Sequence, residues 1–142
     1  MSESLSLNSI HSTEVMVVDD EECIRQTMSA LLSSEGIGCV TANGADECLR
    51  LLGDGFRGVI LMDVMMPGKN GWDTIRAIEK AGLLEGNIIS MLTAMDVPDE
   101  QMEGLQEIVI DYIIKPFDPV DLLSSVRKYL GYLNRPGSPA EP

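Results

Sequence analysis

Short apolar segments alternate with longer amphipathic segments along most of the chain. Each apolar segment has five or six residues. Most are rich in β-branched side chains, as is typical of strands buried on both faces of a parallel sheet. The predicted strands are 14–18, 38–42, 58–62, 87–92 and 109–114.

The segments that follow these strands carry apolar residues at helical spacing. Helices are predicted from about Glu21 to a glycine stop at Gly36, over 45–52, from near Trp72, from just after Asp96 with Pro98 in the first turn, and from Pro119 behind a cap at Asp118. This regular alternation predicts an α/β fold in which helices cover a doubly wound parallel sheet. For five strands we expect the order 2-1-3-4-5.

One domain is predicted for residues 14–131, because 142 residues are too few for two domains of ordinary size. Residues 1–13 are polar and rich in serine, and residues 132–142 contain three prolines. Neither end can bury much apolar surface, so we expect a disordered N-terminal segment and a disordered Pro-rich tail.

Acidic residues exceed basic ones by 23 to 10, which gives a formal net charge of -13 and disfavours direct binding to nucleic acid. No apolar run approaches the roughly 18 residues of a membrane span, and the polar start does not resemble a signal peptide. A cytoplasmic protein with no membrane contact is therefore predicted. Cys23, Cys39 and Cys48 lack the spacing of a zinc site or a disulfide framework, so we expect reduced residues in or beside the core.

Acidic residues follow two of the predicted strands. Asp19 and Asp20 close the first strand, and Asp63 closes the third. In the expected order these strands are neighbours, so the three carboxylates converge at the sheet edge where doubly wound folds bind ligands. Such a cluster needs a cation, and its all-oxygen ligands suit Mg²⁺. The alternative for each acid alone is a helix cap or a solvated loop residue.

Two further polar residues end strands at the same edge. Thr93 closes the fourth strand, and Lys115 closes the fifth. The Lys115 ammonium can pair with phosphoryl oxygens and the Thr93 hydroxyl can bond one of them, so Asp63 is a candidate acceptor of a phosphoryl group. Taken alone, an edge lysine or a strand threonine is ordinary.

Four stretches of sequence resemble the receiver domain of response regulators, the CheY-like domain of two-component signalling. They are VVDDE at 17–21, LMDVMMPGKNGWD at 61–73, LTA at 92–94 and DYIIKPF at 111–117. Asp20, Asp63, Thr93 and Lys115 are separated by 43, 30 and 22 residues, as in such domains. The resemblance covers residues 14–131 and implies a flavodoxin-like (βα)5 sandwich.

The resemblance also implies a role for each matching residue. Asp63 would be the phosphoacceptor, with Thr93 and Lys115 binding the phosphoryl group. The Mg²⁺ ligands would be Asp19, Asp20, Asp63 and the backbone carbonyl of Met65.

Two conformational features are implied as well. Tyr112 matches the aromatic residue whose rotamer follows the phosphorylation state, although an ordinary tyrosine on an edge strand is the alternative. A cis peptide bond is expected between Lys115 and Pro116.

The implied function is a phosphorelay: a sensor histidine kinase or phosphotransfer protein donates its phosphoryl group to Asp63. The surface of the fourth helix, fifth strand and fifth helix would then change and be read by an unknown downstream protein, and a phosphorylation-linked dimer is left open. Only eleven residues follow Gly131, so we expect a single-domain regulator. An excised receiver of a larger hybrid protein is the alternative.

Other functions fit less well. Phosphatases of the haloacid dehalogenase kind need an acid two residues after the nucleophile, where this chain has Met65, so no enzyme with a separate substrate is expected. The chain would catalyse only its own phosphotransfer and dephosphorylation. A flavodoxin would need a phosphate-binding first loop, and acids at 19–22 would repel the phosphate. A receiver that binds partners independently of phosphorylation remains an alternative.

The chain departs from the receiver pattern before its fifth strand. Ile108 and Val109 replace a common Gly-Ala pair and form an apolar run with Ile110. We expect this run in the core, with an interface patch as the alternative.

Three residues of the site loops are also noteworthy. Met65 and Met95 lie two residues after Asp63 and Thr93, and we hypothesise that they shield the acyl phosphate from water. Lys69 stands where an apolar residue is usual, and nothing in the sequence explains it.

Overall fold

The computed structural model describes residues 13–94, 105 and 107–134, and all five predicted strands lie within them. They are β1 (Thr13–Val18), β2 (Gly38–Ala42), β3 (Val59–Asp63), β4 (Ile88–Thr93) and β5 (Val109–Ile114). All four strand pairs are parallel, and the order is β2-β1-β3-β4-β5. The predicted strand order and boundaries are confirmed, the latter to within one residue.

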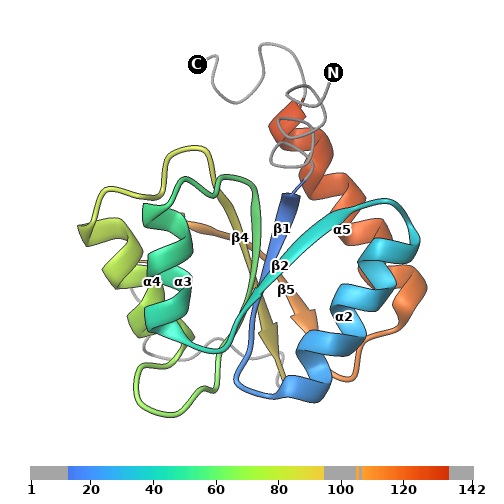
Figure 1. Cartoon of the computed structure of the whole chain (residues 1–142), viewed down its shortest axis with the longest axis horizontal. Coiled ribbons are helices and arrows are strands. Elements are labelled where there is room, and N and C mark those ends of the chain that lie inside the picture. The colour runs from blue at the N-terminus through green and yellow to red at the C-terminus, as the bar shows by residue number, and fades with distance from the viewer. Residues whose placement is uncertain (1–12, 95–104, 106, 135–142) are drawn as a thin grey trace.

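Four described helices cover the two faces of this sheet: α2 (Glu22–Ser34), α3 (Ala45–Gly53), α4 (Gly71–Lys80) and α5 (Pro119–Asn134). Figure 1 shows α3 and α4 on one side of the strands and α2 and α5 on the other. The α/β doubly wound prediction is therefore confirmed. The helix predicted after Asp96, with Pro98 in its first turn, lies outside the described residues.

The core consists of two apolar clusters, one on each face of the sheet. Successive side chains of a strand point to opposite faces, so Met16 and Val18 join one cluster while Val15 and Val17 join the other. All five residues of the central strand β3 are buried. Burial on both faces explains why these strands appear in the sequence as continuous apolar runs rather than as alternating patterns.

Local signals in the sequence set the helix ends. The Asp118 carboxylate accepts hydrogen bonds from the backbone N–H groups of Val120, at 2.8 Å, and Asp121, at 3.2 Å, which confirms the predicted cap of α5. The backbone after α2 turns at Gly36, whose φ of 77° favours glycine, so the predicted stop is confirmed as well.

The apolar run before and at the start of β5, where the sequence departs from the receiver pattern, is only partly in the core. Val109 is buried and Ile108 packs against the same cluster, as expected for core residues. Ile110 is 43% exposed, so the apolar run reaches the surface at its third residue. The β4–β5 register shifts at this point, from Ile89 paired with Val109 to Ser90 paired with Asp111, so Ile110 is an extra residue without a partner in the ladder.

The three cysteines are free and differ in burial. Cys48 is buried and Cys39 is partly buried, whereas Cys23 is exposed at the start of α2. Burial raises the pKa of the Cys39 thiol to about 11 and that of Cys48 to about 12, so both stay protonated at neutral pH. Within the described ranges, no helix combines the length and apolar character of a membrane span.

Candidate functional site

The candidate site lies at the carboxyl edge of the sheet, where the polar residues predicted from the sequence follow their strands. Val18 pairs with Met62 in the β1–β3 register, so Asp19 and Asp63 each come directly after a paired residue. Asp63 itself pairs with Leu92, the residue before Thr93. Strand order and register thus bring the carboxylates of two distant segments to one edge, as predicted.

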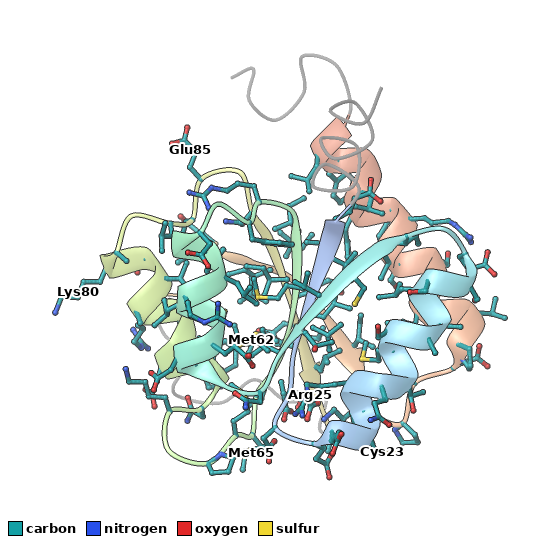
Figure 2. The ribbon with its side chains drawn as sticks, in the orientation of Figure 1. Cys23, Arg25, Met62, Met65, Lys80 and Glu85 are labelled. Atoms are coloured by element: carbon teal, nitrogen blue, oxygen red, sulfur yellow. The ribbon has the colours of Figure 1, made fainter. Side chains whose placement is uncertain are left out.

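Figure 2 helps to locate this edge. Cys23 and Arg25, near the start of α2, and Met65, in the loop after β3, are labelled at the same end of the molecule. Lys80 and Glu85 are labelled well away from them. Segments that are distant in the chain therefore border the same end of the sheet.

Three carboxylates form a tight cluster at this edge. Asp19, Asp20 and Asp63 each offer an oxygen, and these oxygens lie within 4.8 Å of one another. Asp19 is fully buried and Asp63 is 4% exposed, whereas Asp20 is exposed. Two carboxylates are thus removed from water, and the third faces it, an arrangement that could hold a hard cation with water completing its coordination.

Lys115 supplies the nearest positive charge. Its Nζ atom lies 2.9 Å from Asp19 Oδ2 and 3.2 Å from Asp63 Oδ1, so one ammonium pairs with both buried carboxylates. Burial lowers the pKa of Lys115, but the two carboxylates outweigh it, and the pKa is raised overall. Lys115 is therefore a firmly charged group in contact with Asp63.

The contact with Lys115 does not fully compensate the negative charge of the Asp63 carboxylate. Burial raises its pKa, and the Asp19 charge raises it further. The Lys115 ammonium and the Met65 N–H, 3.4 Å from Oδ1, act in the opposite direction, and the result is a pKa of about 6. An added divalent cation would relieve this imbalance, so the residues present fit a metal site.

The other predicted site residues lie on the same elements. Thr93 ends β4, is partly buried, and its backbone carbonyl accepts a hydrogen bond from the Lys115 N–H at 2.7 Å. Tyr112 on β5 is partly buried, and burial raises its pKa. Its ring centroid lies 6.5 Å from that of Trp72 in a tilted arrangement. The peptide bond between Lys115 and Pro116 is cis, as predicted.

The methionines of the shielding hypothesis are only partly visible. The Met65 side chain is 73% exposed, and Met95 lies outside the described residues. The shielding role stays a prediction. Lys69 is exposed, and no described contact explains it.

Two residues of the site were missed by sequence reasoning. A Cβ atom on Gly71 would collide with the backbone oxygen of Asp63 and crowd Met91, so only glycine lets α4 begin against the end of β3. The glycine before an amphipathic helix was visible in the sequence, but the backbone that it must approach was not. Arg25 was also missed: its Nη1 donates to the Asp19 carbonyl at 2.8 Å.

Comparison with known proteins adds a family assignment. The family model for the response regulator receiver domain matches residues 15–127. Among curated proteins, the phosphate regulon transcriptional regulatory protein PhoB of Pseudomonas aeruginosa is 32% identical over 116 residues, covering 82% of this chain and 51% of that protein. The chain thus spans about half the length of the curated relatives that it matches.

Solved structures are similar over the same region. A CheY-like response regulator receiver domain protein from Methanospirillum hungatei shares 47% identity with a TM-score of 0.81, covering 84% of this chain and 95% of that one. The response regulator TrrA of Thermotoga maritima, solved in complex with Mg²⁺ and BeF, shares 28% identity with a TM-score of 0.70, covering 83% and 99%.

Proposed function

The chain belongs to the response regulator receiver family of two-component signalling, and from this premise we propose that it accepts a phosphoryl group on Asp63. The observation that carries the proposal is the position of Lys115, whose ammonium contacts both Asp19 and Asp63 beside a third carboxylate. Receiver domains act with histidine kinases, so the donor is a phosphohistidine on a kinase or phosphotransfer protein. Residues 14–131 form the receiver, with 1–13 and 132–142 as flanking segments.

Asp63 acts as the nucleophile. A carboxylate oxygen bonds to phosphorus while the P–N bond of the donor breaks, and the bonding pair leaves with the imidazole nitrogen. The described hydrogen bonds to this carboxylate, from Lys115 and Met65, both reach Oδ1, so Oδ2 has none within the described part of the chain. The low exposure of Asp63 keeps bulk water from solvating the nucleophile.

Mg²⁺ would be held by Asp19, Asp20, Asp63 and the backbone carbonyl of Met65. When bound, it would neutralise charge on the carboxylates and on the transferred oxygens. The closeness of the three carboxylates and the raised pKa of Asp63 support this ligand set. The similar TrrA structure is a complex with Mg²⁺ and BeF, which supports the same cation for this chain.

Lys115 and Thr93 would bind the phosphoryl group once it is on Asp63. The ammonium is already within hydrogen-bond distance of Asp63, and Thr93 is joined to Lys115 through its backbone carbonyl. A phosphoryl group on Asp63 would therefore attract Thr93 at the end of β4 and Lys115 at the end of β5 at the same time. Tyr112 is paired with Met91, two residues before Thr93 in the β4–β5 ladder, and would change rotamer as Thr93 moves.

The output would be a changed surface on the predicted fourth helix, β5 and α5, read by a downstream protein or by a second copy of the chain. Relatives such as PhoB are transcriptional regulators about twice as long as the matched region. Two forms of the protein are therefore open: a single-domain regulator, or the receiver part of a longer one. The chain is not an enzyme for a separate substrate; it catalyses its own phosphorylation and dephosphorylation. A cytoplasmic location fits this role.

The decisive experiment is intact mass spectrometry after incubation with a small phosphodonor such as acetyl phosphate, with Mg²⁺ or with chelator. We expect one added phosphoryl group that requires Mg²⁺. Asp63→Asn should abolish the adduct, whereas Asp54→Asn, at an exposed position that follows α3, should keep it. An adduct on Asp63→Asn, or none on the folded wild-type chain, would refute Asp63 as the acceptor and favour a phosphorylation-independent interaction domain.

A further inference from the structure

Arg25 reaches the candidate site from α2, and its described contact there is with a backbone carbonyl rather than with a carboxylate. Its guanidinium Nη1 donates a hydrogen bond to the backbone carbonyl of Asp19 at 2.8 Å, six residues earlier in the chain. Side chains of a helix lean toward its N-terminus, so an arginine in the first turns of α2 is directed at the loop that precedes the helix. Figure 2 labels Arg25 at this end of the molecule.

The position of Arg25 is not favoured by helix stability. A cation near the N-terminus of a helix is opposed by the helix dipole, and α2 starts only three residues earlier, at Glu22. Arg25 is partly buried, so the contact also removes part of the side chain from water. A specific hydrogen bond that offsets both costs indicates a positional role for this arginine.

With the hydrogen bond from Arg25, both the backbone and the side chain of Asp19 are held by hydrogen bonds. The Asp19 N–H donates to the Ala42 carbonyl at 3.1 Å, Oδ1 accepts from the Glu21 N–H at 2.9 Å, and Oδ2 accepts from Lys115 at 2.9 Å. With Arg25 on the carbonyl, each polar group of Asp19 has a partner. Asp19 is therefore held rigidly, as its complete burial also indicates.

The Arg25 hydrogen bond also affects the orientation of the next residue, Asp20. The Asp19 carbonyl and the Asp20 nitrogen belong to one planar peptide unit, so holding the carbonyl sets the direction in which the chain enters Asp20. Asp20 is exposed, and no hydrogen bond to its carboxylate is found in the described part of the chain. Among the described contacts, none holds the Asp20 side chain as those with Glu21 and Lys115 hold that of Asp19.

We propose that Arg25 is a positioning residue for the metal site: its hydrogen bond to the Asp19 carbonyl orients the following peptide so that the Asp20 carboxylate faces the cation. The inference rests on the proposed metal site at Asp19, Asp20 and Asp63. Groups that orient metal ligands typically change affinity by about tenfold or more when they are removed. Arg25 thus contributes to metal affinity through geometry, against the repulsion between its own charge and the cation.

The test is Mn²⁺ binding, followed by the loss of the free-ion EPR signal, with Mn²⁺ as a probe for the Mg²⁺ site. Arg25→Met keeps the apolar stem but removes the donor, and we expect affinity to fall about tenfold. Arg25→Lys keeps a donor of similar reach and should recover most of the affinity. Arg50→Met is the matched control, because Arg50 is an exposed cation of α3 whose described ion pairs, with Glu47 and Asp54, lie outside the site.

A double-mutant cycle separates orientation from charge. If Arg25 acts by orienting Asp20, then Arg25→Met should cause little further loss in an Asp20→Asn background. Unchanged or tighter Mn²⁺ binding by folded Arg25→Met overturns the proposal, and so does an equal loss in both backgrounds. A wild-type chain that binds no Mn²⁺ would refute the metal site itself, and the role of Arg25 with it.

Discussion

Replacing Asp63 by asparagine should stabilise the metal-free protein, even though it removes the proposed phosphoacceptor. The pKa of this carboxyl is raised from 3.8 to about 6 by burial and by the Asp19 charge. Because the folded protein binds this proton more tightly than the unfolded chain does, ionisation favours unfolding. The shift corresponds to roughly 3 kcal/mol at a pH above 6, and asparagine avoids this cost.

The sign of the pH dependence follows from the same pKa values. The contribution of Asp63 to stability is greatest below about pH 4 and is lost as the pH rises through about 6. The advantage of Asp63→Asn should therefore be small near pH 4, grow between about pH 4 and 6, and reach at most roughly 3 kcal/mol at about pH 7.5. Lys115 loses one of its two carboxylate partners in the variant and keeps Asp19, which makes this figure an upper limit.

The assay is urea unfolding in chelator at about pH 7.5 and about pH 4.5, monitored by circular dichroism. Asp54→Asn is the control, because it removes the same charge from a chain of net charge -13 at an exposed position. Added Mg²⁺ should stabilise the wild type and narrow the gap. The reasoning is refuted if Asp63→Asn is no more stable than Asp54→Asn at about pH 7.5, or if its excess is equally large at the lower pH.

Three further substitutions test other contacts. Lys115→Met should leave two buried carboxylates without their cation, raising the pKa of Asp63 further and lowering the free energy of unfolding by roughly 1–3 kcal/mol at neutral pH, measured by urea unfolding with and without Mg²⁺. Tyr129→Phe should lower the free energy of unfolding by roughly 1–3 kcal/mol, because the buried Ser90 hydroxyl loses its partner at 3.1 Å and Asp111 loses a hydrogen bond at 2.7 Å. The loss should be smaller in a Ser90→Ala chain, where only the Asp111 bond remains to be lost, and a loss of the same size there would contradict the role of Ser90. Gly71→Ala should push α4 away from Asp63 and slow phosphorylation of Asp63 by acetyl phosphate, whereas Gly53→Ala, which meets open space, should not.

Local patterns made most of the fold predictable. Five β-rich apolar runs, each followed by an amphipathic segment, imply parallel strands. A parallel pair needs a crossover connection, usually a helix, that carries the chain from the end of one strand back to the start of the next. Asp118 and Pro119 mark the start of α5, and both do so in the structure. The helix expected after Asp96 was equally visible in the sequence, but it falls outside the described residues.

The chemistry of the site was predictable in residue type but not in environment. The sequence indicated that Asp19, Asp20 and Asp63 meet, because each follows a strand of one parallel sheet. It did not indicate that two of them are buried and the third exposed, nor that Lys115 pairs with Asp19 as well as with Asp63. Those facts depend on contacts between side chains at the ends of three different strands, and no local sequence pattern predicts such contacts.

The strand and helix pattern, the parallel sheet and the residue types at its carboxyl edge were predictable from the sequence alone, since they follow from periodicity and from short-range capping and turn preferences. Tertiary contacts set the raised pKa of Asp63, the close fit of Gly71 behind it and the hydrogen bond from Arg25 to the Asp19 carbonyl. Burial and electrostatic environment arise from atoms that distant segments contribute, so they exist only once the chain has folded.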